Sequence, residues 1–442
     1  MHTLKSLATL SCLIVISAVA LPSTHAGEQS LSRADYQQKL HGFWLGQSIA
    51  NWTGIVTEMD KIGGEGSTGV FYTREDWGKK DQPNKWGSTF PWLSLNIDWV
   101  FRAPNEIWGS DDDTDIEYIY QHLLAQHGTS MLSGEQIRDG WLAHIYDERN
   151  SPLKNAAGRG ENFLWVSNQR AHDLMLEGLA PPATSDPENN HYYDMIDAQL
   201  TTEIFGLFAP GRPDIALQMA HLPIRTTARG DAADASEFYV VMHALASVAN
   251  PSESRHAQIS GMAQAARAHL PDTSVSARMY DFVKSRYEAG VPWEQARDEV
   301  YQRYQVEQLD GYDMTSRNLD CNGCFAAGIN FAASIVSLLY GEGDFKETVK
   351  IAVLAGWDSD NPAATWGGLL GFMEGKAGIE KLFGRDFSER YNIHRTRTGF
   401  PVPNGVDNFT DMSATGIAIV DRVVTEEMGG RIVNDNWVIS TQ

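Results

Sequence analysis

The stretch AGWDSDNPAATWGGLLG, residues 355–371, constrains the fold more than any other part of the chain. It places acidic residues between two apolar segments, Thr348–Leu354 before it and Ala363–Phe372 after it. Both segments are rich in small residues, so we expect two closely packed, buried helices. A carboxylate removed from water between such helices is costly unless it finds a partner.

Metal coordination is the usual source of that partner. Asp358, Asp360 and Asn361 offer only oxygen ligands, which suit a hard cation such as Mg²⁺, Ca²⁺ or Mn²⁺ and do not suit zinc. The alternative is a surface loop that caps a helix, with Asp360 or Asn361 as N-cap and Pro362 at the first helical position. Taken alone, the stretch supports both interpretations about equally.

A second acidic cluster favours the metal site. Asp111, Asp112, Asp113 and Asp115 lead directly into an amphipathic helical pattern over residues 116–124. One or two acids at a helix start are favoured by the helix dipole. Four within five residues exceed what capping requires and repel one another. Two oxygen-rich clusters, each opening a helix, are what a two-metal site would use.

Length and charge set broader limits. The chain has 442 residues, 42% of them hydrophobic, and no low-complexity linker divides it. We therefore expect one domain over residues 27–442, with a tail at 403–442. The net charge of −22 excludes nucleic-acid binding through a basic surface. The charge does not identify a partner; the partner we expect is a small-molecule or carbohydrate substrate, and the oligomeric state is left open.

Residues 1–26 have the pattern of a secretory signal peptide. Lys5 precedes an apolar run, Leu7–Leu21, and Thr24–Ala26 provides small residues for cleavage. The run is short for a membrane span, and Cys12 lies too deep in it for a lipoprotein signal. We expect export to the periplasm or the medium, with the mature chain starting near Gly27.

Two cysteines remain after cleavage, Cys321 and Cys324. Redox enzymes use this spacing, but no βαβ pattern surrounds it. Two thiols are too few for a structural zinc site. We expect a disulfide that tightens the turn before the next helix, as an oxidising compartment permits.

Helical periodicity dominates the rest of the chain and predicts an all-α fold. The first expected helix, Asp35–Ile49, begins a stripe of small residues at every fourth position, Gly42, Gly46 and Ala50. Further helices are expected at residues 137–146, 162–177, 192–208, 213–221, 232–247, 257–269, 274–287, 292–304, 325–340 and 345–355. Apolar and polar residues alternate with period two mainly at residues 416–424 and 431–439, where we expect a short β element.

Residues 55–109 break the helical pattern and are crowded with aromatic residues. So long an irregular segment is usually functional or disordered, and its tryptophans argue against disorder. Flat aromatic faces suit sugars or bases, whereas packing of a long loop on its own domain explains them equally well. The aromatic residues are Phe71, Tyr72, Trp77, Trp86, Phe90, Trp92, Trp99, Phe101 and Trp108.

Three motifs in order resemble the ADP-ribosylglycohydrolase family, which includes the glycohydrolase that reactivates dinitrogenase reductase. The family's opening glycine helix is matched by Gly42, Gly46, Ala50, Asn51 and Gly54. Its first aspartate motif corresponds to residues 111–114 and its second to residues 357–361, while Gly230-Asp231 resembles its middle part. The match spans nearly the whole mature chain.

The resemblance implies a compact, orthogonal α-helical domain that holds two Mg²⁺ ions and hydrolyses the glycosidic bond of a ribose. The implied metal ligands are Asp111, Asp112, Asp113, Asp358, Asp360 and Asn361. A glutamate seven residues after the opening motif acts beside the metals in some members, and Glu58 stands in that register. The expected catalytic residues are Glu58, Asp112 and Asp113, and the expected substrate-binding residues are Trp108, Trp357 and Asp231.

This chain departs from the family pattern at several positions. Asp111 and Asn361 each replace a threonine, Asn51 replaces an aspartate, and Ala50 replaces a glycine. An extra carboxylate beside an amide could favour Ca²⁺ over Mg²⁺. The aromatic insertion and the export signal also leave room for a sugar substrate other than ADP-ribose.

The sequence therefore predicts an exported, metal-dependent glycohydrolase. It would cleave an N- or O-glycosidic bond of a ribosyl or other furanosyl substrate through a water positioned by the metals. The alternative is a non-catalytic, metal-stabilised binding protein on the same fold. A cation shared by Asp112 and Asp358 beside an accessible pocket would favour catalysis, and one sealed from solvent would favour the alternative.

Overall fold

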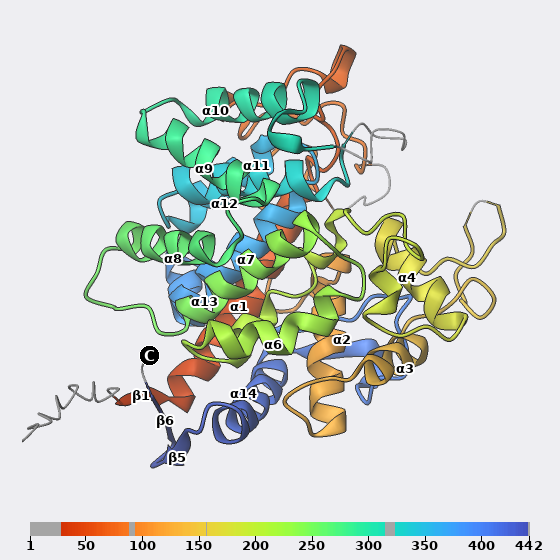
Figure 1. Ribbon diagram of the computed structural model, residues 1–442, viewed down its shortest axis with the longest axis vertical. Coiled ribbons are helices and arrows are strands. Elements are labelled where there is room, and N and C mark those ends of the chain that lie inside the picture. Colours follow the sequence, from red (N-terminus) through yellow and green to blue (C-terminus); the bar gives the residue numbers. More distant parts are fainter. Residues whose placement is uncertain (1–27, 88–92, 156, 314–322, 441–442) are drawn as a thin grey trace, which may run out of the picture.

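The computed structural model describes residues 28–87, 93–155, 157–313 and 323–440, and its architecture is helical (Figure 1). The helices are α1 (Arg33–Gly54), α2 (Asp112–His127), α3 (Gly134–His144), α4 (Val166–Leu176), α5 (Ile204–Phe208), α6 (Pro213–Ile224), α7 (Asp231–Ala246), α8 (Arg255–His269), α9 (Val275–Glu288), α10 (Trp293–Val300), α11 (Ala327–Tyr340), α12 (Phe345–Ala355), α13 (Asp360–Phe383) and α14 (Phe409–Glu426). The expectation of an all-α fold is confirmed.

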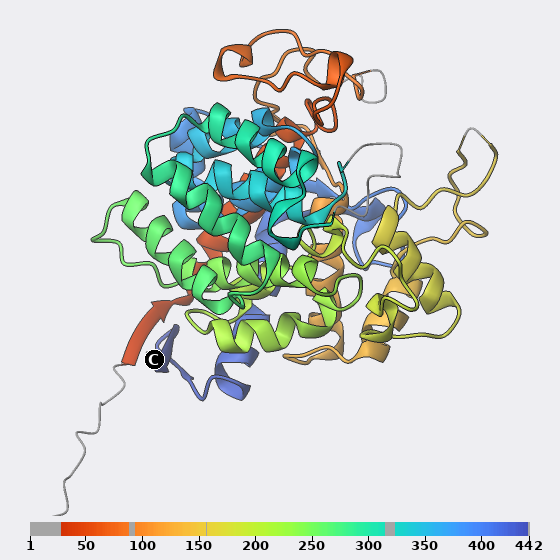
Figure 2. The same cartoon turned by 45° about the horizontal axis from the view of Figure 1, so that its top comes forward.

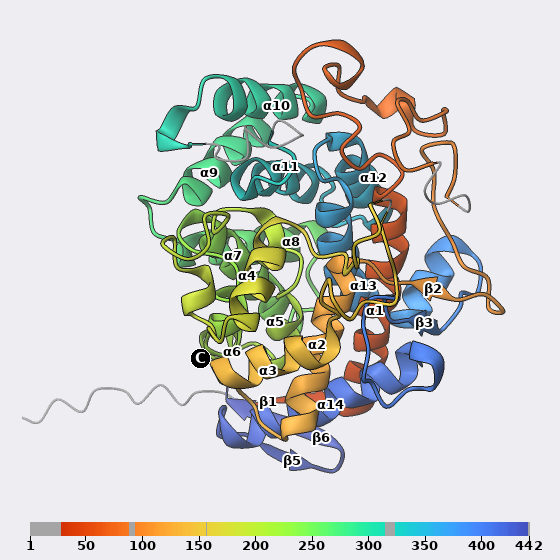
Figure 3. The ribbon, with the colours of Figure 1, turned by 90° about the vertical axis from the view of Figure 1, so that its right-hand side faces the viewer.

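Helices α1 and α13 pack against each other at the centre of the molecule (Figure 3). Their contact is made by glycines on both sides, because any side chain would separate the two backbones. A Cβ atom at Gly42 would overlap the carbonyl oxygen of Gly371, and one at Gly46 would overlap that of Gly367. The stripe of small residues in the sequence thus forms the helix–helix contact that the spacing predicts.

Short strands join distant parts of the chain. β1 (Glu28–Ser32) pairs antiparallel with β6 (Asn436–Ser440), which also pairs with β5 (Arg431–Val433). A second sheet contains β2 (Trp108–Gly109), β3 (Arg390–Asn392) and β4 (Val406–Asn408). The β element expected at residues 431–439 is therefore confirmed.

The strand predicted at residues 416–424 is wrong, because that segment lies within α14. The side-chain oxygen of Asn408 accepts a hydrogen bond from the backbone N–H of Asp411 at 2.9 Å and caps this helix. Its buried residues recur with helical spacing, as Phe409, Met412, Gly416, Val420 and Val423 show. The apparent alternation arises from β-branched residues on an amphipathic helix of which nine of the 18 residues are buried.

Two predicted helices are much shorter than expected. The helix expected over residues 162–177 begins only at Val166, since Phe163 adopts φ 51° and Val166 φ 20°. Most of residues 192–208 is irregular, with a 3₁₀ turn at Ile196–Ala198 before α5. Loops therefore replace helix in both places.

The aromatic segment at 55–109 is a long loop with short 3₁₀ turns, and it lies at one end of the molecule (Figure 2). Most of its described aromatic residues pack on the domain itself. The Trp99 ring contacts those of Phe345 and Phe383, with centroids 6.3 and 4.9 Å away, and Phe71 lies 4.8 Å from Trp357. Phe90 and Trp92 lie outside the described residues.

Among the described residues, no helix combines the length and hydropathy that crossing a membrane requires. Cys324 is buried and takes part in a disulfide. Cys321 lies outside the described residues, so its pairing with Cys324 stays a prediction.

Candidate metal centre and catalytic cavity

Both aspartate motifs line one cavity of about 460 Å³. Its acidic wall contains Asp111, Asp112, Asp113, Asp358 and Asp360, and Glu58 lines the same cavity. The carboxylates form two groups, Glu58 with Asp358 and Asp360, and Asp111 with Asp112 and Asp113. Within each group the nearest oxygens lie within 4.8 Å of one another. Residues more than 240 positions apart in the sequence thus meet at one place.

The first group is held at the start of α2. Asp111 is the N-cap residue, and its backbone N–H donates to the Thr114 hydroxyl at 3.1 Å. The Tyr391 hydroxyl in β3 contacts the same threonine at 2.9 Å. The indole N–H of Trp52 donates to the carbonyl oxygen of Gly109 at 2.9 Å and fixes the strand that enters the motif.

The second group is held between the end of α1 and the start of α13. The backbone N–H of Met59 donates to the Trp357 carbonyl at 2.7 Å, and the N–H of Trp357 donates to the Lys61 carbonyl at 2.7 Å. Met59 and Trp357 both adopt positive φ, at 56° and 57°. This backbone pairing places Glu58 directly beside Asp358.

A second contact joins the end of α1 to the start of α13. The Thr57 hydroxyl lies 2.9 Å from that of Ser359, which donates to the Gly54 carbonyl at 3.1 Å. A Cβ atom at Gly54 would overlap the Cα atom of Asp360. Glycine at the end of α1 is therefore required for α13 to begin so close to Glu58.

Burial and mutual repulsion raise the pKa values of these carboxyl groups. Burial, followed by the charges of Asp360 and Asp358, raises the pKa of Glu58 well above its ordinary value. Burial and the neighbouring aspartates do the same for Asp112 and Asp358. The pKa of Asp360 rises to about 7, again chiefly through burial. So many acids in one cavity are stable only when protons or cations compensate their charge.

The donor set fits divalent cations. All candidate ligands are oxygens, as Mg²⁺ and Ca²⁺ require. Asn361 donates from Nδ2 to Asp113 Oδ1 at 3.3 Å, and Asn51 donates from Nδ2 to Asp111 Oδ2 at 3.2 Å. The side-chain carbonyl oxygens of both asparagines and Asp360 Oδ1 are buried without a hydrogen-bond partner. The acidic groups can therefore hold metal ions, and the unused buried oxygens supply the ligands that such ions need.

A second set of buried polar side chains, two of them carboxylates, lies next to the cavity wall. We call Gln47, Glu117, Glu203 and Thr365 the inner layer. Glu117 follows Asp113 by four positions on α2, and Gln47 and Thr365 lie four positions from Asn51 and Asn361, which donate to Asp111 and Asp113. Glu117 accepts from Gln47 Nε2 at 2.5 Å and from the backbone N–H of Ile204 at 2.8 Å. Glu203 accepts from the Thr365 hydroxyl at 2.7 Å.

The opposite wall of the cavity was not predicted from the sequence. It is formed by the loop before α4 and by residues around Ile196, and its polar members are Glu161 and Asp197. Asp197 accepts hydrogen bonds from the Ser167 hydroxyl at 2.5 Å and the Asn168 N–H at 2.9 Å. The apolar members of the cavity lining are Ile55, Met59, Trp86, Phe163, Trp165, Val166, Ile196, Leu200 and Phe325.

The structure does not bring the three expected substrate-binding residues to this cavity. Trp108 is fully buried and donates its indole N–H to the Ser388 carbonyl at 2.9 Å. Trp357 is also fully buried, and its indole N–H donates to Gln305 Oε1 at 2.6 Å. Asp231 accepts from the N–H of Val275 at 2.8 Å, at the start of α9. Each supports the scaffold instead of lining the cavity.

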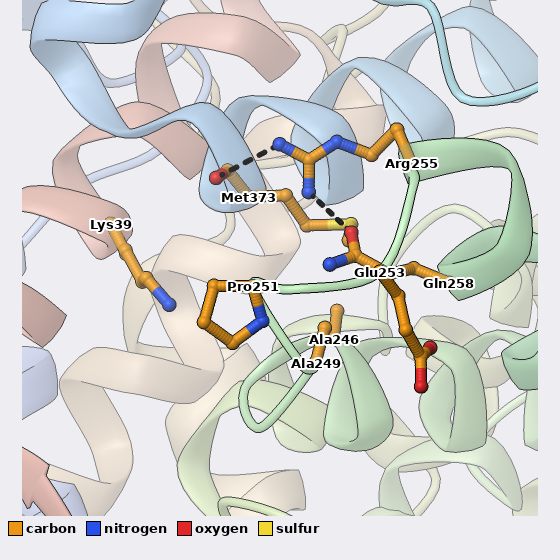
Figure 4. A pocket seen from close by; sticks show the side chains of 8 residues that line it. All are labelled: Lys39, Ala246, Ala249, Pro251, Glu253, Arg255, Gln258 and Met373. Carbon is orange, nitrogen blue, oxygen red and sulfur yellow. Dashed lines mark hydrogen bonds between the residues drawn. The ribbon is translucent and has the colours of Figure 1, made fainter.

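A second hollow of about 320 Å³ has a different character (Figure 4). Lys39 lies on one side of it and Arg255 on the other. Arg255 donates to Gln258 Oε1 at 2.9 Å and is paired with Glu374 at 2.7 Å, so its charge is already used. This hollow contains no group of acids comparable to the first cavity.

The fold and the acidic cavity define a helical scaffold with an acidic centre that could hold metal ions. The family model described as ADP-ribosylglycohydrolase matches residues 32–396, and the chain belongs to this family. The match includes Glu58 and both aspartate motifs. The protein is thus a hydrolase of the ADP-ribosylglycohydrolase type.

A solved structure described as an "ADP-ribosylglycohydrolase-related protein complex" is similar at 17% identity. The match covers 88% of this chain and 99% of that one, with a TM-score of 0.47. No curated protein matches the chain.

Proposed function

We propose that the protein is an exported, metal-dependent glycohydrolase that cleaves the N- or O-glycosidic bond of a ribosyl or other sugar substrate. The main support for this proposal is that Glu58 and both aspartate groups line the same cavity. Glu58, Asp111 and Asp112 are partly exposed to it. A centre reached from the cavity supports catalysis over a sealed, purely structural ion.

The ligands of two divalent cations would be Asp111, Asp112, Asp113, Asp358, Asp360 and Asn361. Bound there, Mg²⁺, or alternatively Ca²⁺ or Mn²⁺, would supply Lewis-acid polarisation and compensate the charge of the carboxylates. The buried, unpartnered oxygens of Asp360 and Asn361 support this ligand set.

Glu58 is the residue we assign to proton transfer. Hydrolysis joins the water oxygen to the anomeric carbon, while the bond from that carbon to the leaving oxygen or nitrogen breaks. Glu58 accepts the proton that the water loses, and the leaving atom takes up one proton in return. Burial and the neighbouring aspartates raise the pKa of Glu58, and a cation bound beside it would favour the ionised form, which is the form that accepts a proton. Asp112 and Asp113 are the alternative bases.

A substrate screen tests the proposal. Mature protein is assayed with ADP-ribosyl substrates and aryl glycosides, with Mg²⁺ and with EDTA, while calorimetric titration measures metal binding directly. We expect turnover that EDTA abolishes and Mg²⁺ restores. Turnover unchanged by EDTA would contradict the metal dependence, and metal binding without any turnover would favour the non-catalytic alternative.

Export is part of the proposal and rests on the signal-like pattern of residues 1–26. N-terminal sequencing of protein recovered from the periplasm or the medium tests it. A chain starting near Gly27 supports export. A chain retained in the cytoplasm and starting at Met1 contradicts it.

A further inference from the structure

The loop between α3 and α4 supplies part of the opposite wall of the catalytic cavity. The structure describes residues 145–155 and 157–165 of this loop. Glu161, Phe163 and Trp165 from its end line the cavity. Irregular backbone makes up most of the described loop. Its position relative to the acidic groups therefore depends on contacts with other parts of the chain.

A C-terminal segment, residues 394–398, holds this loop at both ends, and we call it the anchor segment. At the start of the loop, the backbone N–H of Tyr146 donates to the Thr396 carbonyl at 3.1 Å. At its end, the Thr396 hydroxyl donates to the Asn162 carbonyl at 2.8 Å. The same residue of the anchor segment thus joins the two ends of the loop.

Packing of side chains adds to these hydrogen bonds. The His394 ring lies 5.0 Å from the Phe163 ring, and the guanidinium of Arg395 lies 4.2 Å from the centre of that ring. The Phe163 ring lies 6.4 Å from that of Trp165. The anchor segment therefore contacts an aromatic residue of the cavity lining as well as the backbone of the loop.

Arg397 connects the loop to the first acidic group. Its Nη1 atom donates to the Asn162 carbonyl at 2.7 Å, and its Nε atom lies 2.9 Å from Asp115 Oδ2. Both side chains of this ion pair are fully buried. Asp115 lies in the first turn of α2, directly after the aspartate motif at residues 111–114. One guanidinium group thus bridges the helix that carries the metal motif and the loop of the opposite wall.

The shape of the arginine side chain makes this bridge possible. A guanidinium group has five N–H donors in a fixed plane, so it can hold a carboxylate and a carbonyl group at a constant separation. Lysine could still pair with Asp115, but it is a flexible point charge and would not fix the second contact. Breaking a buried ion pair leaves a charge uncompensated and is costly, so we expect the bridge to persist in the folded protein.

We propose that Arg397 is a positioning residue that sets the distance between the opposite wall and the first acidic group of the cavity. Its catalytic consequence rests on the proposed glycohydrolase function. A sugar held against the opposite wall would present its anomeric carbon to the acidic groups at the distance that this bridge defines. Arg397 acts through Asp115 and Asn162.

Hydrogen–deuterium exchange of the mature protein tests the bridge without a substrate. Arg397→Lys retains a positive charge beside Asp115 and removes the planar fork. We expect the amides of residues 161–168 to exchange about tenfold faster than in the unmodified protein, as loss of one buried hydrogen bond implies. The amides of α7 should be unchanged. Unchanged exchange at residues 161–168, or an equal increase throughout the chain, would overturn the inference.

Two further variants separate the bridge from general stability. Arg225→Lys is the matched control, because Arg225 at the end of α6 forms a partly buried ion pair with Glu237 at 2.9 Å. It should leave exchange at residues 161–168 unchanged. Thr396→Val removes the hydroxyl that donates to the Asn162 carbonyl and keeps the ion pair. It should give a smaller increase in the same region, and it decides the question if Arg397→Lys does not fold.

Kinetics test the consequence for the reaction. Turnover is measured with ADP-ribosyl-arginine and with 4-nitrophenyl ribofuranoside at saturating Mg²⁺. In Arg397→Lys, kcat should fall by roughly 10–100-fold, since misplacement by about 1 Å can cost that much, while Mg²⁺ affinity from calorimetric titration hardly changes. An unaltered kcat, or a loss explained entirely by weaker Mg²⁺ binding, would overturn the positioning role. Absence of turnover by the unmodified protein would count against the proposed function, and hydrogen exchange would still decide on the bridge.

Discussion

Two neighbouring sets of buried polar side chains differ in how their charge is compensated. In the inner layer, Glu117 and Glu203 contact each other and receive hydrogen bonds from neutral donors. In the cavity wall, Asp360 Oδ1 and the side-chain oxygen of Asn361 have no such partner. Helix α2 carries members of both sets, since Glu117 is fully buried on it and Asp112 is partly exposed to the cavity.

The difference shows that the supply of donors, together with access from the cavity, decides what a buried acid can bind. In the inner layer each carboxylate oxygen of the two glutamates accepts a hydrogen bond, and the side-chain oxygen of Gln47 alone lacks a partner. The cavity wall keeps unused oxygens beside carboxylates that lie within 4.8 Å of one another in each group, and a cation needs several such oxygen ligands. We therefore assign a scaffold role to the inner layer and propose that the cavity wall carries the chemistry.

The largest expected effect comes from removing a charge from the cavity wall. Asp358→Asn should lose metal affinity and turnover together, by more than the ~100-fold that loss of a supporting outer group costs. Calorimetric metal titration and turnover at several Mg²⁺ concentrations measure both. Asp386→Asn, at an exposed aspartate after α13, is the control. Full Mg²⁺ affinity in Asp358→Asn would remove this residue from the ligand set.

A second substitution separates proton transfer from metal binding in the same wall. Glu58→Gln preserves size and hydrogen bonding, so kcat should fall by roughly 10²–10⁴-fold while metal affinity hardly changes. Glu65→Gln, at an exposed position in the same loop, should behave as the unmodified enzyme. A parallel fall in metal affinity would make Glu58 a ligand, and full activity would move the base to Asp112 or Asp113.

The smallest expected effect concerns the inner layer and appears in stability rather than activity. Burial raises the pKa of Glu203 to about 7, so the folded state binds its proton more tightly than the unfolded state does. Its stabilising contribution is complete below the unfolded pKa and is lost as pH rises through about 7. The loss amounts to at most about 3 kcal/mol.

Chemical denaturation of the EDTA-treated protein between pH 5 and 8 measures this loss. Glu203→Gln should have a flatter pH dependence than the unmodified protein, because the amide cannot ionise. Glu188→Gln, at an exposed glutamate, should retain the original slope. An unchanged slope in Glu203→Gln would mean that the inner layer does not titrate as a proton-sharing pair.

The sequence predicted the contact at the centre of the molecule because spacing alone determines it. Gly42, Gly46 and Ala50 lie on one face of any helix, and they meet the glycines of α13. The composition of the two aspartate motifs predicted a shared metal site, and the family resemblance supported it. Nothing in their local pattern shows that the ends of α1 and α13 are bridged by Met59 and Trp357.

The cavity's apolar wall could not be predicted in the same way. Phe163 and Trp165 fall in a segment with helical periodicity, yet positive φ at Phe163 and Val166 delays the helix. Asp197 lies in another segment predicted as helix, whereas it caps α4 from a 3₁₀ turn. Both features depend on tertiary contacts that override local preference. Trp108 and Trp357 were expected in the site because they adjoin the aspartate motifs, and Asp231 because of the family resemblance, yet all three side chains contact the scaffold.

The pairing of β1 with β6 and of α1 with α13 bears on the order of events during synthesis. The Thr57–Ser359 contact spans 302 residues, and β1 finds its partner strand only at residues 436–440. A nascent chain therefore possesses Glu58 long before it possesses Asp358. Contacts of such long range form late in folding. If the proposed export takes place before the chain folds, the acidic centre is assembled only in the compartment to which the protein is exported.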